Sequence, residues 1–531
     1  MEVHAAGHEG PGEGVAQGLI SGDCADYRAR ITPHKTACID LASGEAVDYA
    51  GLDVRVGRAA GWLAGLGLEA GDPMAFLGRN SLDAVALAIA CERIGAVFAP
   101  LNWRLTPAEL APVLADAGPA LLLADGEFET TAQQAAAEEG LPVVSLQPGL
   151  DELTRDCEPV AGRPGRPGRP DEPLALLYSS GTTGRPKGVV ITRRNALFSA
   201  LNFAFVGAVG PETVALLDLP IFHTIGLVAV TRTTLTMGGT LIISDRFIPD
   251  RTLAALSDPS FGVSHYFCVP QMAAMLRDHP QFDAGRLSGL KAIFVGGSPV
   301  SAQLIQAWLA AGVPLVNGFG MTEAGTVMHM PLDREAVRAN PGSIGLPAPF
   351  LEIRLVDAAG NDVPEGTPGE LWLRGPSVTH GYWTASAGDG PFADGWYRTG
   401  DVLRREPNGF YSLIDRLKDI YISGGENVYP GEVEAVLAGH PAVREVAVFG
   451  VPDERWGESG IAHVVLVEGA GIDLQTLLAH CEARLARFKR PQRIVLVETI
   501  PRTASGKALK YLLREAHAAA ANADPDSSRS S

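Results

Sequence analysis

The sequence predicts an α/β protein with a large N-terminal lobe of α/β subdomains plus a β-rich subdomain, followed by a small, mobile α+β C-terminal domain. The chain has 531 residues, which is too many for a single domain of about 100–200 residues. Short apolar runs alternate with helical patterns over most of the first 350 residues, which is typical of parallel sheets covered by helices. Beyond residue 350, short strands and turns dominate instead.

The large lobe contains the clearest alternation of strands and helices. Five apolar runs are short enough to be buried strands, and a helical pattern at residues 81–94 lies between the first two. The strands are expected at residues 73–77, 97–100, 120–123, 142–145 and 174–178. The β-rich subdomain is expected to use residues 351–356, 369–374 and 411–413.

The C-terminal part has a pattern of its own from about residue 419. Strands are expected at residues 421–422, 443–451, 461–467 and 493–496, and helices at 431–438 and 473–486. A unit of this size can form a separate domain. We therefore predict an N-terminal domain at residues 21–418, a mobile C-terminal domain at 419–515, and disordered ends at 1–20 and 516–531.

Composition excludes several classes of protein. The formal net charge is −18, from 43 Lys and Arg against 61 Asp and Glu, which argues against nucleic acid as the main partner. Six scattered cysteines form no C-x-x-C pair, so neither a disulfide framework nor a zinc ribbon is expected. There is no signal peptide and no run of about 20 uncharged apolar residues. We expect a cytoplasmic protein with no integral membrane contact.

Residues 162–170 repeat Gly-Arg-Pro three times. Each proline lacks an amide donor, which excludes a helix or an inner strand. A surface loop is the simplest interpretation, and anion binding by its arginines is the alternative.

A Ser/Thr/Gly-rich segment follows the strand expected at residues 174–178. Small residues let backbone amides approach phosphate oxygens, hydroxyls add donors and a lysine adds charge. It is not a Walker A loop, because Pro186 and Gly188 occupy positions that require glycine and Ser/Thr. The expected polyphosphate contacts are Ser179, Ser180, Gly181, Thr182, Thr183, Gly184 and Lys187.

This segment resembles the signature of the adenylate-forming superfamily, which includes acyl-CoA synthetases, firefly luciferase and the adenylation domains of peptide synthetases. Eight further motifs follow in the family's order, and the likeness covers about residues 25–515. The motifs lie at residues 220–227, 295–300, 317–323, 369–375, 397–401, 415–419, 423–430 and 501–507. The resemblance implies an AMP-forming acid–thiol ligase that uses ATP, Mg²⁺ and coenzyme A.

The resemblance implies two steps: a carboxylic acid attacks ATP to form an acyl-adenylate and pyrophosphate, and a thiol then displaces AMP. Lys507 resembles the family's mobile lysine, which bridges the carboxylate and the α-phosphate. Thr322 is expected to bond the α-phosphate, and Glu323 looks like the magnesium ligand.

The same resemblance assigns a nucleoside pocket. Phe319 would stack on adenine, although a core aromatic is the alternative, and Gly297, Ser298 and Gly320 would shape the pocket. A carboxylate can accept both ribose hydroxyls, and the expected pair is Asp401 with Arg416.

The remaining assignments concern the thiol and the movement between the two steps. His223 matches a position beside the acyl carboxylate and thiol tunnel, where it would orient or gate, with a general-base role left open. Lys418 is the expected hinge. The expected coenzyme A contacts are Ser423, Gly424, Gly425 and Lys489, the last of which could instead form a solvated basic pair with Arg490.

The same residues argue against several other functions. A serine hydrolase fails because Val300 replaces the last glycine of a nucleophile elbow, and no histidine spacing suits a metalloenzyme. An amino-acid-activating module would place aspartate where His223 stands. Loading of a separate carrier protein is the alternative to coenzyme A. A luciferase-like oxygenase and a homodimer also stay open.

The acid is expected to be apolar, either a fatty or an aromatic acid. Apolar residues follow His223 and flank the nucleotide motifs, namely Ile225, Leu227, Val228, Phe267, Met321 and Val327. Arg232 would either pair with a second substrate carboxylate or be a surface or helix-end arginine.

Overall fold

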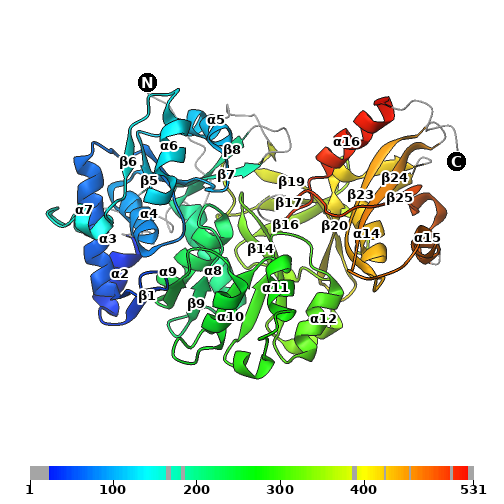
Figure 1. Ribbon diagram of the computed structural model, residues 1–531, viewed down its shortest axis with the longest axis horizontal. Helices are drawn as coiled ribbons and strands as arrows, with labels where there is room; N and C mark the ends of the chain where they lie inside the picture. The colour runs from blue at the N-terminus through cyan, green and yellow to red at the C-terminus, as the bar shows by residue number, and fades with distance from the viewer. Residues whose placement is uncertain are drawn as a thin grey trace.

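The computed structural model describes residues 23–162, 169–180, 186–384, 391–423, 426–453, 456–482, 484–502 and 506–523. Four sheets organise these residues, two of them largely parallel and helix-covered, one antiparallel, and one in the smaller C-terminal unit (Figure 1). The predicted α/β class is therefore confirmed. The expected N-terminal tail, residues 1–20, and most of the Gly-Arg-Pro repeat lie outside the described residues.

A six-stranded sheet forms the first layer, in the order β6-β5-β3-β4-β7-β8. Its strands pair in parallel except β7 and β8, which form an antiparallel hairpin. The strands are β3 (Pro73–Leu77), β4 (Val97–Pro100), β5 (Leu121–Ala124), β6 (Val143–Ser145), β7 (Pro173–Ser180) and β8 (Pro186–Thr192). The helices of this part are α3 (Tyr49–Gly65), α4 (Leu82–Ile94), α5 (Pro107–Ala117), α6 (Glu129–Ala136) and α7 (Leu150–Leu153).

A nine-stranded sheet forms the second layer, in the order β15-β14-β13-β12-β11-β9-β10-β1-β2. Its strands are β1 (Thr36–Asp40), β2 (Ala46–Asp48), β9 (Val214–Leu217), β10 (Thr240–Ile243), β11 (His265–Cys268), β12 (Ala292–Val295), β13 (Leu315–Met321), β14 (Gly325–His329) and β15 (Leu346–Pro347). Its helices are α2 (Cys24–Ile31), α8 (Arg193–Gly207), the π-helix η2 (Ile225–Arg232), α9 (Thr233–Met237), α10 (Pro249–Ser257), α11 (Pro270–Arg277), α12 (Ala302–Ala310) and α13 (Arg334–Ala339).

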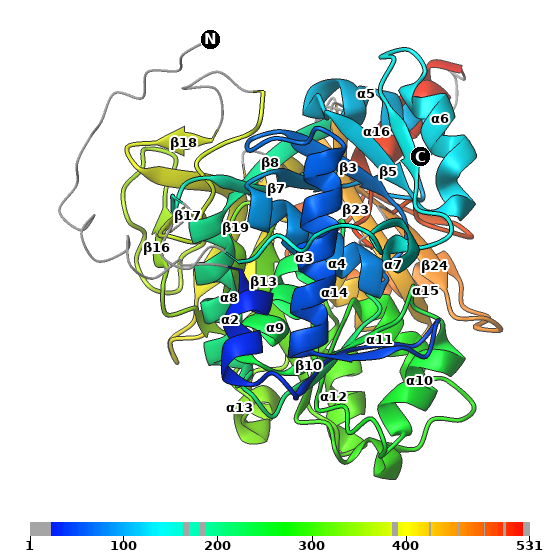
Figure 2. The same ribbon diagram turned by 90° about the vertical axis from the view of Figure 1, so that its left-hand side faces the viewer.

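Helices α3 and α4 lie between these two sheets, as Figure 2 shows. The Ser81 side chain begins α4 by accepting a hydrogen bond from the Ala84 amide at 3.1 Å. Most of α4 is buried on every side, which is expected of a helix enclosed by two layers. Met74 of β3 and Leu241 of β10 therefore belong to one shared core.

An antiparallel sheet and the C-terminal unit complete the chain. The first contains β16 (Glu352–Val356), β17 (Gly369–Arg374), β18 (Phe392–Ala393), β19 (Trp396–Arg405) and β20 (Tyr411–Arg416). After the 3₁₀-helix Leu417–Asp419, the second contains β21 (Tyr421–Ser423), β22 (Glu426–Val428), β23 (Val443–Asp453), β24 (Gly457–Leu466) and β25 (Arg493–Leu496). Its helices are α14 (Pro430–Ala438), α15 (Leu474–Glu482) and α16 (Lys510–Ala523).

Two expectations for the C-terminal helices differ from the structure. Helix α15 ends at Glu482, earlier than the predicted 486. Helix α16 continues to Ala523, past residue 515 where we expected the disordered tail to begin, and the His517 ring lies 6.4 Å from the Phe449 ring of β23. A ring contact thus extends order into a segment whose composition indicated a tail.

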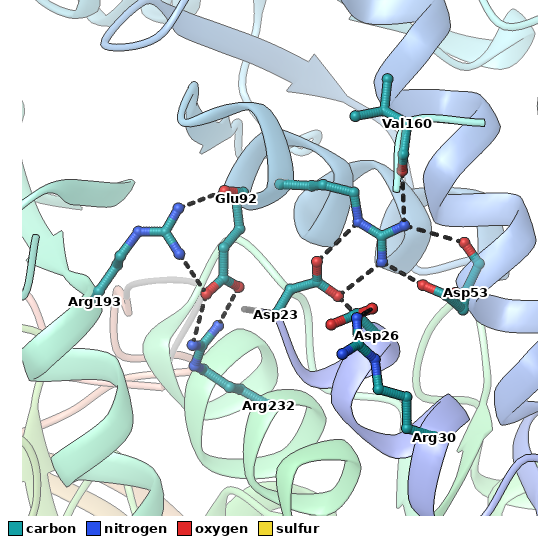
Figure 3. Close-up of polar contacts among 9 residues, drawn as sticks. Asp23, Asp26, Arg30, Asp53, Glu92, Val160, Arg193 and Arg232 are labelled. Atoms are coloured by element: carbon teal, nitrogen blue, oxygen red, sulfur yellow. Dashed lines mark hydrogen bonds and ion pairs between the residues drawn. The ribbon is translucent and has the colours of Figure 1, made fainter. Parts of the chain in front are cut away.

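A buried ionic cluster joins helices from the two layers (Figure 3). The two carboxylate oxygens of Glu92, near the end of α4, lie 2.7 and 3.0 Å from the guanidinium nitrogens of Arg232. Arg193 Nη1 is 3.1 Å from the same carboxylate, and Arg193 also bonds the Glu92 carbonyl. Burial by itself would raise the pKa of Glu92, but the two guanidiniums hold it below its usual value.

Arg232 is consequently neither a surface arginine nor a free partner for a second substrate carboxylate. It is the last residue of η2, and its guanidinium is occupied by Glu92. The sequence could not indicate this pairing, because Glu92 lies 140 residues away.

We predict that Glu92→Gln lowers the free energy of unfolding by about 3–5 kcal/mol, because it removes the counter-charge of the buried Arg232 and leaves Arg193 with only Glu172, at 3.5 Å. Denaturant unfolding followed by circular dichroism measures this loss. The matched control is Glu127→Gln, which removes a largely exposed partner of Arg79 and should cost less than about 1 kcal/mol. Equal small effects in both variants would contradict the prediction.

Candidate active site

The site forms where the C-terminal unit meets the large lobe, and Lys507 lies at its centre. Partial loss of water lowers the pKa of Lys507, as does the nearby Arg416, whereas Asp401 and Glu323 oppose this shift. The preceding residue, Gly506, lies against α11: a Cβ built on it would be 2.7 Å from Gln271 Oε1. The structure therefore brings together four residues that are widely separated in the sequence.

Asp401 and Arg416 face each other on neighbouring strands β19 and β20. Arg416 Nε lies 2.7 Å from Asp401 Oδ1, and the Asp401 side chain is 2% exposed. Burial raises the pKa of Asp401, while Arg416 and Lys507 oppose that rise. Asp401 Oδ2, 3.5 Å from Arg416 Nη2, has acceptor capacity left for a polar ligand.

Glu323 lies in the turn between β13 and β14, directly after Thr322. Its carbonyl accepts a hydrogen bond from the Thr379 amide at 2.7 Å, and its Oε1 accepts one from the Tyr382 hydroxyl at 3.2 Å. The Tyr382 ring also lies 5.4 Å from Lys187 Nζ, within cation–π range. Tyr382 thus links Glu323 to the phosphate-loop lysine.

The predicted phosphate loop is the connection of the β7–β8 hairpin. In the pairing register, Ser179 lies opposite Lys187 and Ser180 opposite Pro186. The four residues at the tip, Gly181, Thr182, Thr183 and Gly184, lie outside the described residues. The hairpin therefore places Lys187 at the base of the loop, beside Tyr382 and Glu323.

The residues predicted to bind adenine lie at two neighbouring parallel strands: Gly297 and Ser298 follow β12, and Phe319 and Gly320 lie near the end of β13. Gly297 has φ +84°, a left-handed conformation that favours glycine, and turns the chain after β12. Ser298 Oγ is buried, with no hydrogen-bond partner among the described residues. A Cβ on Gly320 would lie 2.3 Å from the Gly325 carbonyl oxygen, so this position excludes a side chain. Phe319, which directly precedes Gly320 in β13, is partly buried.

His223 lies immediately before η2, and its ring is 4.5 Å from that of Phe222. Burial, Arg104 and Lys507, in that order, lower the pKa of His223 to about 4. The imidazole is therefore neutral at pH 7 and shares a site with Lys507. A π-helix after such a residue is common at functional sites.

The sequence motifs did not indicate two residues that lie near this cluster, Tyr382 and Arg104. Tyr382 belongs to none of the recognised motifs. Arg104 follows β4, and its guanidinium lies 4.8 Å from the Trp103 ring centroid and 5.9 Å from that of Phe222. One signal could have indicated Arg104, because ligands of α/β sheets bind beyond the carboxyl ends of parallel strands.

The donor set fits one kind of metal site. No group of three or more His, Cys, Asp or Glu side chains suited to a metal occurs within the described ranges. Glu323 is instead a single carboxylate beside the phosphate-loop lysine. That arrangement fits Mg²⁺ held by one carboxylate together with phosphate and water oxygens.

The hinge candidate directly follows this cluster in sequence, two residues after Arg416, and the coenzyme A candidates lie in the C-terminal unit. Lys418 is exposed in the 3₁₀-helix that connects β20 to the C-terminal unit. Ser423 ends β21 and is buried, whereas Gly424 and Gly425 lie outside the described residues. Lys489 Nζ is 2.5 Å from Glu432 Oε2 within the C-terminal unit. The solvated pair with Arg490 is thus replaced by an ion pair with Glu432.

None of the helices that the structure describes is both long and apolar enough to span a bilayer.

The fold and the site together define a two-part nucleotide-binding enzyme in which the C-terminal unit contributes a lysine to the large lobe. The AMP-binding enzyme family model matches residues 25–383, and the AMP-binding enzyme C-terminal domain model matches residues 432–507. The chain belongs to the AMP-binding enzyme family.

Relatives and solved structures match over almost the whole chain. Feruloyl-CoA synthase from Amycolatopsis sp. is 40% identical, over 92% of this chain and 97% of that protein. Indoleacetate–CoA ligase from Aromatoleum aromaticum is 35% identical, over 92% and 96%. O-succinylbenzoate coenzyme A synthetase from Bacillus subtilis, solved with ATP and magnesium ion, is 31% identical with a TM-score of 0.81, covering 93% of this chain and 99% of that one.

We predict that Lys507→Ala reduces acyl-adenylate formation by at least about 100-fold, because a charge positioned for the transition state is lost. Thioester formation from a supplied acyl-adenylate should change by less than about fivefold, since Lys507 is expected to act only before AMP leaves. Pyrophosphate release and thioester formation measure the two half-reactions separately. Lys291→Ala, an exposed lysine, is the control. Equal losses in both half-reactions would exclude this division of roles.

We also predict a pH dependence of stability that arises from His223. Its pKa is about 4 in the fold against 6.5 in the unfolded chain, so the unfolded chain binds the extra proton between these values. The free energy of unfolding should fall as the pH drops from 6.5 to 4.5, by at most about 1.4 kcal/mol per pH unit for this group. His223→Asn should make that slope shallower, whereas His34→Asn, at an exposed position, should not. An unaltered slope in His223→Asn would refute the assignment.

Proposed function

We propose that this protein is an ATP-dependent carboxylic acid:CoA ligase of the AMP-forming type. The observation that carries the proposal is the convergence of Lys507 with Asp401, Arg416 and Glu323, beside a neutral His223. These residues lie in motifs of different parts of the chain, and a fold needs none of them together for stability alone. Two relatives that match along nearly its full length are named as CoA ligases or synthases.

In the first step, a substrate carboxylate oxygen forms a bond to the α-phosphorus of ATP. The bond to the bridging oxygen breaks, and pyrophosphate leaves with the electron pair. Lys507 offsets the negative charge that the carboxylate and phosphate bring together, and Thr322 donates to the α-phosphate. Mg²⁺ held at Glu323 supplies further neutralisation of the phosphates. Asp401 and Arg416 hold the ribose, while Phe319, Gly297, Ser298 and Gly320 hold adenine.

In the second step, the sulfur of coenzyme A bonds to the acyl carbon, AMP leaves with the electron pair, and the thiol proton passes to solvent or to a neutral base. His223 is neutral at pH 7 and can orient or accept from the thiol. Rotation at Lys418 would remove Lys507 and bring Ser423, Gly424 and Gly425 to the acyl group. For Lys489 to meet coenzyme A phosphates, it would first have to leave Glu432.

The acid is an aromatic one. The rings of Phe203, Phe267 and Phe294 lie within 5.2–6.1 Å of one another, between α8 and the ends of β11 and β12. The cavity among these rings is only about 10 Å³, the space of about one water molecule, so a substrate would have to displace side chains to enter it. A flat ring that did so could stack on the aromatic side chains already present. The names of the two CoA-ligating relatives, feruloyl and indoleacetate, agree with this choice.

We propose that the reaction takes place in the cytoplasm. All six cysteines are free thiols, and four of them are buried, which suits a reducing compartment. ATP, which the first step consumes, is also available there.

We predict AMP and pyrophosphate release from ATP with aryl acids, and AMP release that depends on coenzyme A. A panel that pairs aryl acids with linear fatty acids of 4 to about 16 carbons should show at least ~10-fold higher kcat/KM for an aryl acid, because a flat ring can stack on aromatic side chains. Coupled AMP detection measures both dependences. Release of AMP without dependence on coenzyme A would favour a carrier protein as acceptor, and no pyrophosphate with any acid would overturn the proposal.

A further inference from the structure

A short segment joins the turn that contains Glu323 to the base of the phosphate loop. We call this segment, residues 379–384, the strap. The Thr379 amide donates to the Glu323 carbonyl at 2.7 Å, and the Thr379 hydroxyl donates to the Val190 carbonyl at 2.6 Å. Glu323 follows β13 of the nine-stranded sheet, whereas Val190 belongs to β8 of the six-stranded sheet. One strap residue therefore connects the two sheets at the proposed site.

The strap then runs alongside β8 as a short antiparallel partner. Tyr382 bridges Val189, and the Trp383 amide donates to the Gly188 carbonyl at 2.8 Å. Because Gly188 directly follows Lys187, these contacts lie at the base of the phosphate loop. Paired backbone groups fix the path of a chain segment, so the strap presents the Tyr382 side chain at one defined place.

The end of the strap is held by helix α5 of the large lobe. The Trp383 indole nitrogen donates to the Ala117 carbonyl at 3.2 Å, and the Thr384 hydroxyl donates to Asp116 Oδ1 at 2.5 Å. The Tyr382 side chain takes no part in either contact. A substitution at Tyr382 should therefore leave the path of the strap intact, so that its effects report on the side chain alone.

The Tyr382 side chain contacts two opposite charges through two different parts. Its hydroxyl donates to Glu323 Oε1 at 3.2 Å, and its ring centroid lies 5.4 Å from Lys187 Nζ. The hydrogen bond restricts rotation of the carboxylate and leaves lone pairs for a cation. The ring attracts the ammonium through its quadrupole and does not neutralise it. A direct ion pair between Glu323 and Lys187 would instead cancel both charges before ATP and Mg²⁺ bind.

We propose that Tyr382 is a positioning residue for ATP with its Mg²⁺: the hydroxyl orients the Glu323 carboxylate for the cation, and the ring keeps Lys187 available to the phosphates. The inference rests on the proposed ligase function and adds the residue that couples its cation site to its phosphate loop. Hydrogen-bond partners of metal-binding carboxylates change metal affinity by about 10–100-fold when they are removed. An effect of that size is measurable by binding alone, without turnover.

The test measures ATP binding by isothermal titration calorimetry, once with excess Mg²⁺ and once with EDTA, and with no acid present. Tyr382→Phe removes the hydroxyl and keeps the ring. Its Kd for ATP in Mg²⁺ should rise by about tenfold, whereas its Kd in EDTA should change by less than about twofold. Tyr382→Leu removes the ring as well, so it should also weaken ATP binding in EDTA, by about threefold or more, because Lys187 loses its aromatic contact.

Two further variants separate positioning from folding. Tyr266→Phe is the matched control, since the Tyr266 hydroxyl donates to the carboxylate of Asp218 at 3.0 Å in a buried part of the nine-stranded sheet. It should lower the melting temperature and leave both values of Kd unchanged. The second variant is Glu323→Gln, in which Tyr382→Phe should change the Kd in Mg²⁺ by less than about twofold. The carboxylate that the hydroxyl orients is then absent, so the two effects are not additive.

The binding measurement distinguishes failure of this inference from failure of the ligase proposal. If no acid is turned over, yet Tyr382→Phe selectively loses ATP binding in Mg²⁺, the ligase proposal fails and the Tyr382 proposal stands. Equal weakening in Mg²⁺ and in EDTA for Tyr382→Phe, or additive effects with Glu323→Gln, overturns the Tyr382 proposal and leaves the ligase proposal intact. A wild-type protein that does not bind ATP overturns both.

Discussion

The contact between Glu92 and two arginines fixes how helices α4, α8 and η2 are arranged relative to one another. Glu92 belongs to α4, between the two large sheets, while Arg193 begins α8 and Arg232 ends η2. Apolar packing tolerates small sliding of helices, whereas a bidentate ion pair in a low-dielectric core requires one geometry. The contact therefore positions both α8, which carries Asn202 and Phe203, and η2, which follows His223.

Local charge explains how a protein with a net charge of −18 can handle anionic substrates. Lys507, Arg416 and Arg104 lie near one another, close enough to influence the pKa of Lys507 or His223, and Lys187 lies beside Glu323 through Tyr382. Asp401 and Glu323 are the acidic residues of this group. We expect Asp401 to accept hydrogen bonds from a polar ligand and Glu323 to bind a cation. The field at the site is thus set by a few residues, not by the average composition.

Much of the candidate site could be predicted because its residues lie in short motifs whose chemistry is local. A Ser/Thr/Gly loop before Lys187, or a glycine pair before Ser298, has the same backbone geometry wherever the chain folds around it. Tyr382 and Arg104 could not be found this way, since their importance comes from neighbours distant in sequence. The pairing of Arg232 could not be found for the same reason, since its partner Glu92 lies on another helix, although its position at the end of η2 agrees with the helix-end alternative.

The sequence by itself determined the α/β class, the order of the strands along the chain and the motifs that we propose form a phosphate loop, a nucleoside pocket and a mobile lysine. Periodicity, turn residues and motif chemistry are local, so they can be deduced from neighbouring residues. Only the tertiary structure decided that Lys507 lies near Asp401, Arg416 and Glu323, that Arg232 is occupied by Glu92, and that Tyr382 lies beside Glu323 and Lys187. Pairing, burial and pKa depend on which distant residues come into contact, and that depends on packing of the whole chain.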